Sequence, residues 1–281
     1  MIDLRCGDCL ELMKDIPDGS VDLVLTDPPY GTTACKWDSV IPFEPMWEQL
    51  NRIIKQNGAI CLFGSEPFSS ALRMSNIKHF KYDWYWNKSK SGNFMNANKQ
   101  PHKKVEVISV FYKKQPTYNP QKIKNPKGIE KRMLTENKSR QKMVFVGQVS
   151  TSKEITQAGK YYEADKLLPS CVIKFNNENK PIHPTQKPIA LLEYLIRTYT
   201  NEGETVLDFT AGSMSTVIAC INTNRNCIAI EKDKHYFSVG CERVHNHILD
   251  NNIDLCYNQV CGGVCLWQSS KTEQVKDMVG F

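Results

Sequence analysis

The sequence contains no run of about 18 or more apolar residues, the length that a helix needs to span a membrane. Its first residues, MIDLRCGDCL, lack the cationic region and apolar core of a secretory signal peptide. The 11 cysteines are scattered over 281 residues, unlike the dense frameworks of small disulfide-bonded secreted proteins. These absences predict a soluble cytoplasmic protein with reduced thiols and no membrane partner.

The sequence also lacks a complete set of metal ligands. Cys6 and Cys9 form one close pair with no obvious matching pair, and Cys261 and Cys265 form another, with Cys256, His245 and His247 nearby, which is a somewhat stronger but still weak signal. A structural zinc ion needs about four ligands in a tetrahedron. We therefore expect no metal site, and small buried thiols near the amino end.

The length and charge of the chain set two further bounds. With 281 residues and 41% hydrophobic content, the chain can form one large domain or a large domain with an insertion. Its net charge of +6 permits a polyanionic partner without requiring one.

Apolar patterns typical of strands and helices alternate along the chain. Strands are expected at 21–26, 59–63, 82–86, 105–112, 205–209 and 227–230, and helices at 43–54, 66–76, 189–199 and 217–223. Asn57-Gly58 is expected to stop the first of these helices. The alternation predicts an α/β fold with several parallel strands.

Residues 113–168 interrupt this alternation. Between Lys113 and Lys142 there are ten basic residues against two acids, and apolar periodicity is poor. The composition fits either an inserted subdomain whose basic face meets phosphates or a solvated loop. The chain thus divides into residues 1–112, the insertion 113–168, residues 169–245, and a tail of unknown role at 246–281.

The tetrapeptide Asp27-Pro28-Pro29-Tyr30 directly follows the strand expected at 21–26. Two consecutive prolines cannot continue a strand ladder, since neither supplies an N–H and both have a fixed φ. The tetrapeptide therefore ends the strand and leaves Asp27 and Tyr30 on a stiff loop beyond its carboxyl end. Open α/β sheets usually bind ligands at that edge.

A second ligand signal is the strand TVLDF with the turn TAGSMST that follows it. Gly212 lets a ligand approach the backbone of the turn, and Glu231, 23 residues beyond Asp208, follows the next strand. This spacing suits a nucleoside whose ribose hydroxyls donate to the carboxylate, although the dinucleotide motif G-x-G-x-x-G is absent. Ahead of this unit, the segment HPTQKP forms a stiff loop that leads into the helix expected at 189–199.

In this order, DPPY, HPTQKP and DFTAGS resemble the motifs of a DNA amino-methyltransferase that uses S-adenosylmethionine, of the β group, whose motif order is circularly permuted. The resemblance spans about Ile2 to Arg243 and includes GDCLELM, LFGSEPF and FYKKQPTYNPQ, of a bacterial or phage type. It implies a Rossmann-like, mostly parallel seven-stranded sheet with one reversed strand and helices on both faces. Residues 1–112 would form the catalytic half, the insertion the target-recognition region, and residues 169–245 the cofactor-binding half.

The resemblance also implies roles for individual residues. The catalytic tetrapeptide consists of Asp27, Pro28, Pro29 and Tyr30. Asp27 and the carbonyl of Pro28 would accept hydrogen bonds from the exocyclic amino group of a flipped base, and Tyr30 would stack on that base. The implied cofactor-binding residues are Asp8 near the adenine, Cys9 beside it, Asp208, Phe209, Thr210, Gly212 and Ser213 at the methionine end, Glu231 on the ribose, and His183, Thr185 and Lys187 around the methionine pocket.

The implied chemistry is direct methyl transfer to an amine. Two acceptors can hold the amine nitrogen near a tetrahedral shape and direct its lone pair at the methyl group, without a covalent enzyme adduct. In the family, aspartate at the first position of the tetrapeptide is commoner with adenine N6 transfer, so duplex DNA methylated at adenine N6 is the predicted product. N4-cytosine transfer is the alternative, and an RNA or protein amino-methyltransferase is a third. A homodimer and a cognate restriction endonuclease are further partners that the sequence leaves open.

One position departs from the family pattern. Met214 replaces a glycine of the usual GSGS or GSGT turn. If this position has a positive φ or touches the cofactor, the methionine costs on the order of 1 kcal/mol or obstructs the pocket. A DNA-binding relative with weak or no catalysis is therefore a second interpretation, while the intact DPPY favours activity.

Overall fold

The computed structural model describes residues 1–32, 38–92, 96–124, 130–133, 161–164, 166–178, 182, 185–253, 256–261 and 264–269. Contacts divide the chain into two units, Met1–Asn119 with Ser170–Phe281, and Pro120–Pro169. The second unit begins at Pro120 rather than at Lys113. Asn119 belongs to the first unit, where its backbone N–H donates to the carbonyl of Thr198 at 2.7 Å.

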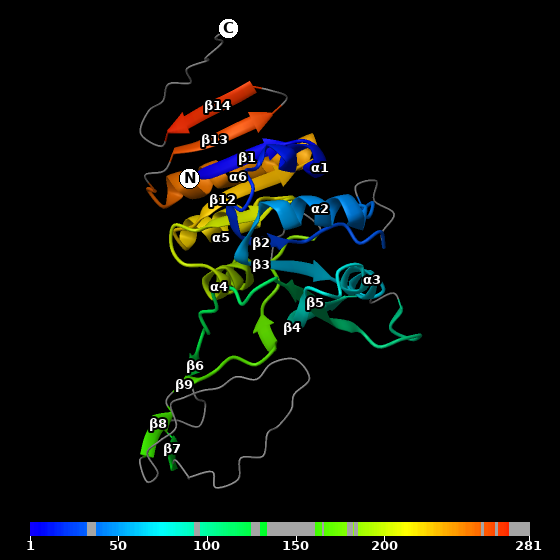
Figure 1. Cartoon of the computed structure of the whole chain (residues 1–281), viewed down its shortest axis with the longest axis vertical. Helices are drawn as coiled ribbons and strands as arrows, with labels where there is room; N and C mark the ends of the chain where they lie inside the picture. The colour runs from blue at the N-terminus through cyan, green and yellow to red at the C-terminus, as the bar shows by residue number, and fades with distance from the viewer. Residues whose placement is uncertain are drawn as a thin grey trace. The chain divides into compact units, whose positions relative to one another are not determined.

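The first unit is built on one sheet of ten strands in the order β10-β4-β5-β3-β2-β11-β12-β1-β13-β14 (Figure 1). The strands are β1 (Ile2–Cys6), β2 (Val21–Thr26), β3 (Ile54–Gly64), β4 (Phe80–Gly92), β5 (Lys103–Phe111), β10 (Val172–Phe175), β11 (Thr205–Asp208), β12 (Asn226–Glu231), β13 (Cys256–Cys261) and β14 (Val264–Ser269). All pairings are parallel except those of β5 with β3 and β4 and that of β14 with β13. The α/β prediction is confirmed.

The sheet is wider than the seven strands predicted. Seven consecutive strands, from β4 to β1 in the sheet order, contain β5 as the one reversed strand, as the resemblance implies. β10 adds one strand at one edge, and β13 and β14 add two at the other. The last two come from the tail, where the alternation of apolar and polar residues is too weak to predict a strand.

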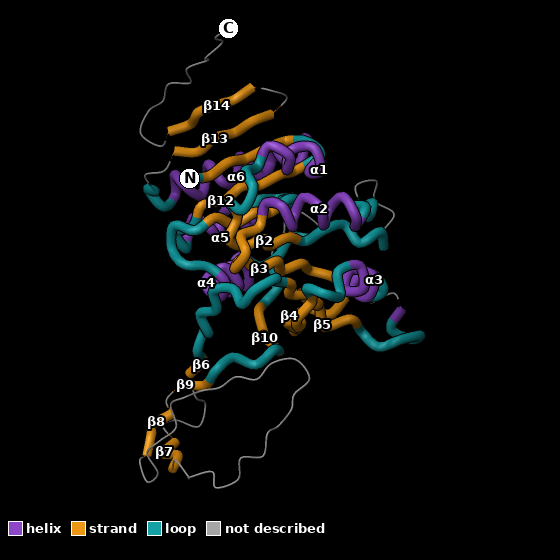
Figure 2. Tube along the Cα trace, in the orientation of Figure 1, coloured by secondary structure: helices purple, strands orange, loops and turns teal. Residues whose placement is uncertain are grey.

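Helices cover both faces of the sheet (Figure 2). One face carries α4 (Ile189–Tyr199), α5 (Ser215–Asn222) and α6 (Lys234–Asp250), whose apolar side chains share a single buried cluster. The other carries α1 (Cys9–Leu12), the short 3-10 helix η1 (Met13–Asp15), α2 (Phe43–Ile53) and α3 (Phe68–Ser75), which share a second cluster.

The central strands are buried on both sides because successive side chains point to opposite faces. In β11, Val206 packs in the first cluster and Leu207 in the second. In β12, Cys227 and Ile228 divide in the same way. This explains why LVL in β2 and CIAI in β12 are continuous apolar runs rather than alternating ones.

The prediction that Asn57-Gly58 stops a helix is wrong. α2 ends at Ile53, and β3 begins at Ile54. The pairing of β2 with β3 shifts between Val21 and Leu23, so Asn57 and Gly58 lie in an irregular part of the strand. A Cβ on Gly58 would lie 2.8 Å from the backbone oxygen of Asp22, so glycine is needed here for close approach of two strands.

The second unit contains two short antiparallel pairs in its described part. β6 (Ile123–Lys124) pairs with β9 (Lys166–Leu167), and β7 (Glu130–Met133) pairs with β8 (Tyr161–Ala164). The role predicted for this region, target recognition, stays a prediction.

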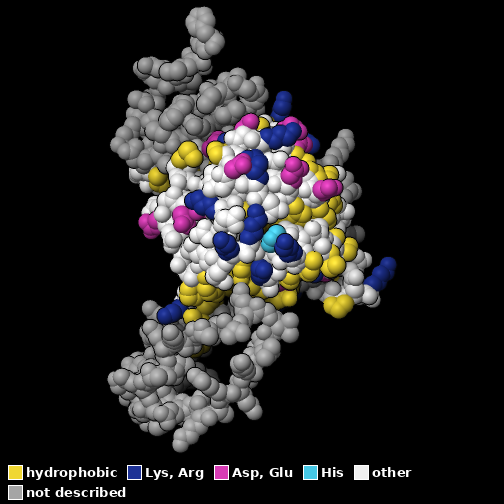
Figure 3. All heavy atoms as spheres, viewed as in Figure 1, with side chains coloured by type: hydrophobic (Ala, Val, Ile, Leu, Met, Phe, Trp, Pro, Cys, Tyr) yellow, Lys and Arg dark blue, Asp and Glu magenta, His cyan; other side chains and the backbone are white. Residues whose placement is uncertain are grey.

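Two surface properties bear on function. Across the described residues, none of the helices has the length and apolar character required to cross a bilayer. Lys and Arg side chains and Asp and Glu side chains occur together on the face seen in Figure 3.

Candidate active site

The carboxyl ends of β1, β2, β11 and β12 border one cavity of about 510 Å³. The predicted site residues that line it are Asp8, Cys9, Asp27, Pro29, Thr185, Lys187, Asp208, Phe209, Thr210, Gly212, Ser213 and Glu231. Pro28 is buried and Tyr30 is half-buried, and neither is part of the described wall. His183 lies outside the described residues.

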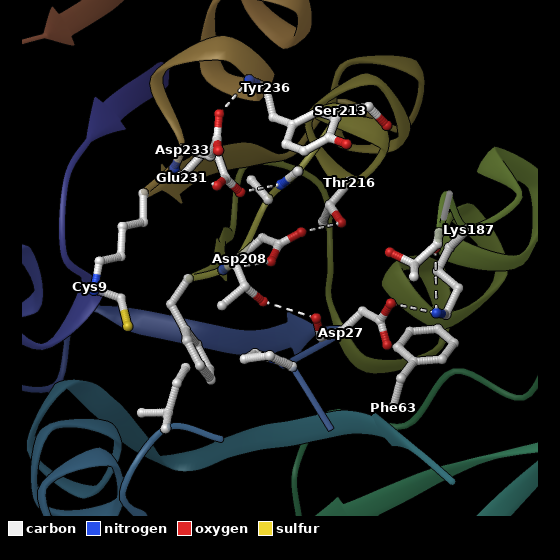
Figure 4. Close-up of a pocket in the computed structure, with 18 of the residues that line it drawn as sticks. Cys9, Asp27, Phe63, Lys187, Asp208, Ser213, Thr216, Glu231, Asp233 and Tyr236 are labelled. Carbon is white, nitrogen blue, oxygen red and sulfur yellow. Dashed lines mark hydrogen bonds and ion pairs between the residues drawn. The ribbon is translucent and has the colours of Figure 1, made fainter. Parts of the chain in front are cut away.

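Asp27 is the point at which the DPPY loop meets the rest of the site (Figure 4). Its carboxylate accepts hydrogen bonds from the Tyr30 hydroxyl at Oδ1 and from the Lys187 ammonium at Oδ2. Its backbone carbonyl accepts from Thr210 Oγ1 at 3.0 Å. The Tyr30 ring stacks on Phe68, with centroids 5.1 Å apart and an interplanar angle of 29°. The loop is therefore fixed through both carboxylate oxygens, its backbone and its aromatic ring.

Two charged residues that the sequence did not reveal extend this arrangement. Lys187 Nζ lies 2.9 Å from Oε1 of Glu106 on β5, and Oε2 of Glu106 lies 3.3 Å from Nζ of Lys88 on β4. The hydroxyl of Tyr30 lies 3.4 Å from Glu106 Oε1. Two carboxylates and two ammonium groups are thus in contact around Asp27.

These contacts shift the pKa values of Asp27, Glu106 and Lys187. Burial raises the pKa of Asp27, Lys187 opposes the rise, and Glu106 adds to it. Burial also acts to raise the pKa of Glu106, but Lys187 and Lys88 hold it below its usual value. Burial acts to lower the pKa of Lys187, but the two carboxylates raise it to about 12. Lys187 is therefore an ammonium ion at neutral pH.

Glu231 joins the turn after β11 to the end of β12. Its Oε2 accepts from the backbone N–H of Gly212 at 2.7 Å, and its Oε1 accepts from that of Asp233 at 2.7 Å. Gly212 has a φ of 51°, a conformation that glycine adopts without steric cost. Burial raises the pKa of Glu231. Each carboxylate oxygen has a further lone pair, so the side chain can still accept from a ligand hydroxyl.

Met214 has a φ of 60° and is the N-cap of α5, so the condition of positive φ holds at this position. Its side chain is fully buried in the cluster under α4, α5 and α6, and it is not part of the cavity wall. A Cβ on Gly240 of α6 would lie 2.5 Å from Met214 Cγ, so the missing side chain of Gly240 makes room for the methionine. The structure therefore supports the strain predicted for Met214 and not the obstruction.

Asp208 connects the turn to the DPPY strand. Its Oδ1 accepts from Thr26 Oγ1 at 3.0 Å and from the backbone N–H of Thr210 at 3.2 Å, and its Oδ2 accepts from Thr216 Oγ1 at 2.6 Å. Burial raises the pKa of Asp208 to about 6. Sequence reasoning missed Thr26 and Thr216, because a threonine at the end of a strand or inside a helix carries no signal of its partner.

Asp8 and Cys9 lie where β1 leads into α1. Asp8 is the N-cap of α1, where its Oδ1 accepts from the backbone N–H of Leu10 at 2.9 Å and its Oδ2 from Lys232 Nζ at 2.9 Å. The hydrogen bond from Lys232 holds the pKa of Asp8 below its usual value. Burial raises the pKa of the Cys9 thiol to about 11, so the thiol is protonated at neutral pH. Within the described residues, no cluster of His, Cys, Asp and Glu side chains could hold a metal ion.

Comparison with known proteins gives consistent matches over most of the chain. A family model for N6 and N4 methyltransferases, described as DNA methylase, matches residues 21–242. The type II methyltransferase M.HpaI of Haemophilus parainfluenzae is 27% identical, over 92% of this chain and 80% of its own length. The DNA adenine methyltransferase YhdJ of Escherichia coli is 29% identical, over 85% of this chain and 81% of its own length.

Two solved structures share the fold. A complex of M1.HpyAVI with SAM has a TM-score of 0.57 and 23% identity, and the match covers 86% of this chain and 100% of that one. The cytosine-N4-specific PvuII DNA methyltransferase has a TM-score of 0.61 and 18% identity, with 89% and 87% covered. Because the family model spans more than half of the sequence, this chain belongs to the DNA methylase family of N6-adenine and N4-cytosine methyltransferases.

Proposed function

We propose that this protein transfers a methyl group from S-adenosylmethionine to the exocyclic N6 amino group of adenine in double-stranded DNA. The observation that carries the proposal is that three parts of the site border the same cavity: Asp27 of DPPY, the turn at Gly212, and Glu231 at the end of β12. The hydrogen bond from Thr210 Oγ1 to the carbonyl of Asp27, 3.0 Å long, joins these two parts directly. Donor and acceptor would therefore meet in a fixed geometry.

The residues present fit S-adenosylmethionine, the methyl donor. The cavity, of about 510 Å³, has the size of a small-molecule site. Glu231 can accept from the ribose hydroxyls, Gly212 leaves space at the backbone, and Asp8 lies on the wall where the adenine is expected. When bound, the cofactor supplies a methyl group on a positively charged sulfur.

The acceptor side then has a defined task. A base within a duplex cannot reach a cavity at the edge of a sheet, so the base must flip out of the helix. Its amino group would donate to Asp27 and to the Pro28 carbonyl, which point the nitrogen lone pair toward the methyl carbon. The electrons of the carbon–sulfur bond remain on sulfur, and the nitrogen, briefly positive, loses one proton to water. Asp27 stabilises that positive charge in a site with little water.

Tyr30 has to exchange partners in this scheme. Its hydroxyl contacts Oδ1 of Asp27, and its ring stacks on Phe68. An amino group that arrives at Oδ1 would displace the hydroxyl, and the freed ring could then stack on the base.

N4-cytosine transfer is the second candidate, and the likeness to the cytosine-N4-specific PvuII enzyme favours it. YhdJ, an adenine methyltransferase by name, favours N6. The homodimer, the cognate restriction endonuclease and the cytoplasmic location stay predictions.

The test is to incubate the purified protein with unmethylated duplex DNA and labelled S-adenosylmethionine, and to digest the DNA to nucleosides. Mass spectrometry should find N6-methyladenine. N4-methylcytosine would replace adenine by cytosine in the proposal, and DNA binding with neither product would support the non-catalytic interpretation. Asp27→Ala is the control that should bind cofactor without product.

A further inference from the structure

Four charged side chains of alternating sign lie in contact, two of which, Asp27 and Lys187, line the cavity, while Glu106 and Lys88 are not part of its wall. Lys187 contacts Asp27 and also lies 2.9 Å from Glu106, which in turn lies 3.3 Å from Lys88. They come from four elements, namely the DPPY loop, β5, β4 and the loop before α4. Their side chains are only 10% to 19% exposed, so solvent screens these charges weakly.

The two oxygens of the Asp27 carboxylate have different partners. Oδ2 is bound by the Lys187 ammonium, which is itself held over the ring of Phe63 at 5.1 Å from the centroid. Oδ1 is contacted only by the Tyr30 hydroxyl among the hydrogen bonds of the described residues. A neutral hydroxyl is displaced more easily than an ammonium ion, since hydrogen bonds between charged groups are the stronger ones. Oδ1 is therefore the oxygen available to an incoming amino group.

Lys187 alone would weaken the chemistry proposed for Asp27. An ammonium ion at Oδ2 cancels much of the negative potential that should stabilise a positive nitrogen at Oδ1. Glu106 corrects this, because its carboxylate, 2.9 Å from Lys187 Nζ, offsets the charge of the ammonium. Lys88 contacts the second oxygen of Glu106 and so fixes the orientation of its carboxylate.

We propose that Glu106 is a positioning residue for methyl transfer: it holds Lys187 on Oδ2 of Asp27, leaves Oδ1 for the target amino group, and preserves the negative charge of the acceptor site. This inference rests on the proposed function. Glu106 acts through Lys187 and needs no contact with cofactor or base.

The central variant is Glu106→Gln, which keeps the shape of the side chain and removes its charge. Glu106→Asp is the conservative variant, and Glu11→Gln removes a carboxylate from an exposed pair with Lys14 as the matched control. Thermal unfolding and calorimetric binding of S-adenosylmethionine establish that each variant folds and binds cofactor.

The first measurement is the rate of transfer to DNA. Glu106→Gln should lower kcat by about 10- to 100-fold, the size of effect expected from a misplaced reacting group, while KM for the cofactor changes little. Glu106→Asp should recover part of the rate, and Glu11→Gln should behave as the wild type. A merely structural role would instead lower stability and leave kcat of the folded enzyme unchanged.

The second measurement is the titration of Asp27, followed by NMR of protein labelled with ¹³C at aspartate carboxyl carbons. The charged or titratable groups that face Asp27 are Lys187, Glu106, Tyr30 and Asp208, with Lys88 behind Glu106. Removing the charge of Glu106 should lower the pKa of Asp27, whereas Lys187→Gln should raise it. Shifts of opposite sign require both groups to act on Asp27 in the folded protein.

Different outcomes separate this inference from the proposed function. If the wild type methylates DNA but Glu106→Gln retains full kcat, or the pKa of Asp27 does not move between the two variants, the positioning role is refuted and the function stands. If the wild type methylates neither base, the proposed function fails and the inference with it.

Discussion

Replacement of Met214 by glycine, the residue usual in the family turn, should destabilise this protein. The change relieves a positive φ, a gain on the order of 1 kcal/mol. It also removes a fully buried side chain, at a cost of about 2–5 kcal/mol for the loss of transfer energy and the cavity left behind. The net expectation is a loss of about 1–4 kcal/mol in the free energy of unfolding. Because Met214 is not part of the cavity wall, cofactor affinity should change little.

Gly240 supplies the second half of the experiment. Gly240→Ala alone would place a Cβ 2.5 Å from Met214 Cγ, so it should destabilise the protein. In the Met214→Gly background the same alanine would have space on that side, although the backbone oxygen of Gly212, 3.2 Å away, remains close. The cycle should therefore show a favourable coupling of about 1–3 kcal/mol in urea unfolding. Additive effects, or a Met214→Gly variant more stable than the wild type, would show that the two side chains do not share this space.

Three further predictions concern the acceptor side and its support. Asp27→Asn should retain cofactor binding by calorimetry but lower kcat about 10²- to 10³-fold, and a wild-type rate would assign the acceptor role elsewhere. Tyr30→Phe should keep most of the activity, since the ring can still stack. Tyr30→Ala should weaken binding of DNA by about 1–3 kcal/mol per stacked base, as measured by DNA titration. Equal losses of DNA binding in the two variants would contradict the stacking role. Asp208 has a pKa near 6 in the fold against a reference of 3.8, so the folded state holds the proton more tightly than the unfolded chain. The contribution of Asp208 to stability should therefore be greatest below about pH 4 and fall by up to about 3 kcal/mol as the pH rises to about 6. The free energy of unfolding in urea should be measured over that interval for the wild type and for Asp208→Asn, and the same pH dependence in both proteins would contradict this.

The sequence allowed prediction of those parts of the site that interrupt regular structure. DPPY breaks a strand, and the turn at Gly212 requires small residues, so each leaves a local pattern. Glu106 leaves none, because it lies inside VEVISVFY, where its residues indicate only a strand. Its partner Lys187 is 81 residues away in the sequence and meets it only after the sheet has formed. The outer strands escaped prediction for a related reason, since pairing through the backbone needs no particular side-chain pattern.

The permuted motif order is compatible with what the chemistry requires of the fold. Methyl transfer needs the acceptor loop and the cofactor turn side by side, and β2 and β11 are adjacent parallel strands that end at the same edge. The hydrogen bond between Thr26 and Asp208 joins residues 182 positions apart, at the last position of each strand. Adjacent strands can be connected in either order as long as the joining segments leave this edge free. The adjacency that the Thr26–Asp208 contact marks, and not the order of the motifs along the chain, therefore places the DPPY loop beside the turn at Gly212.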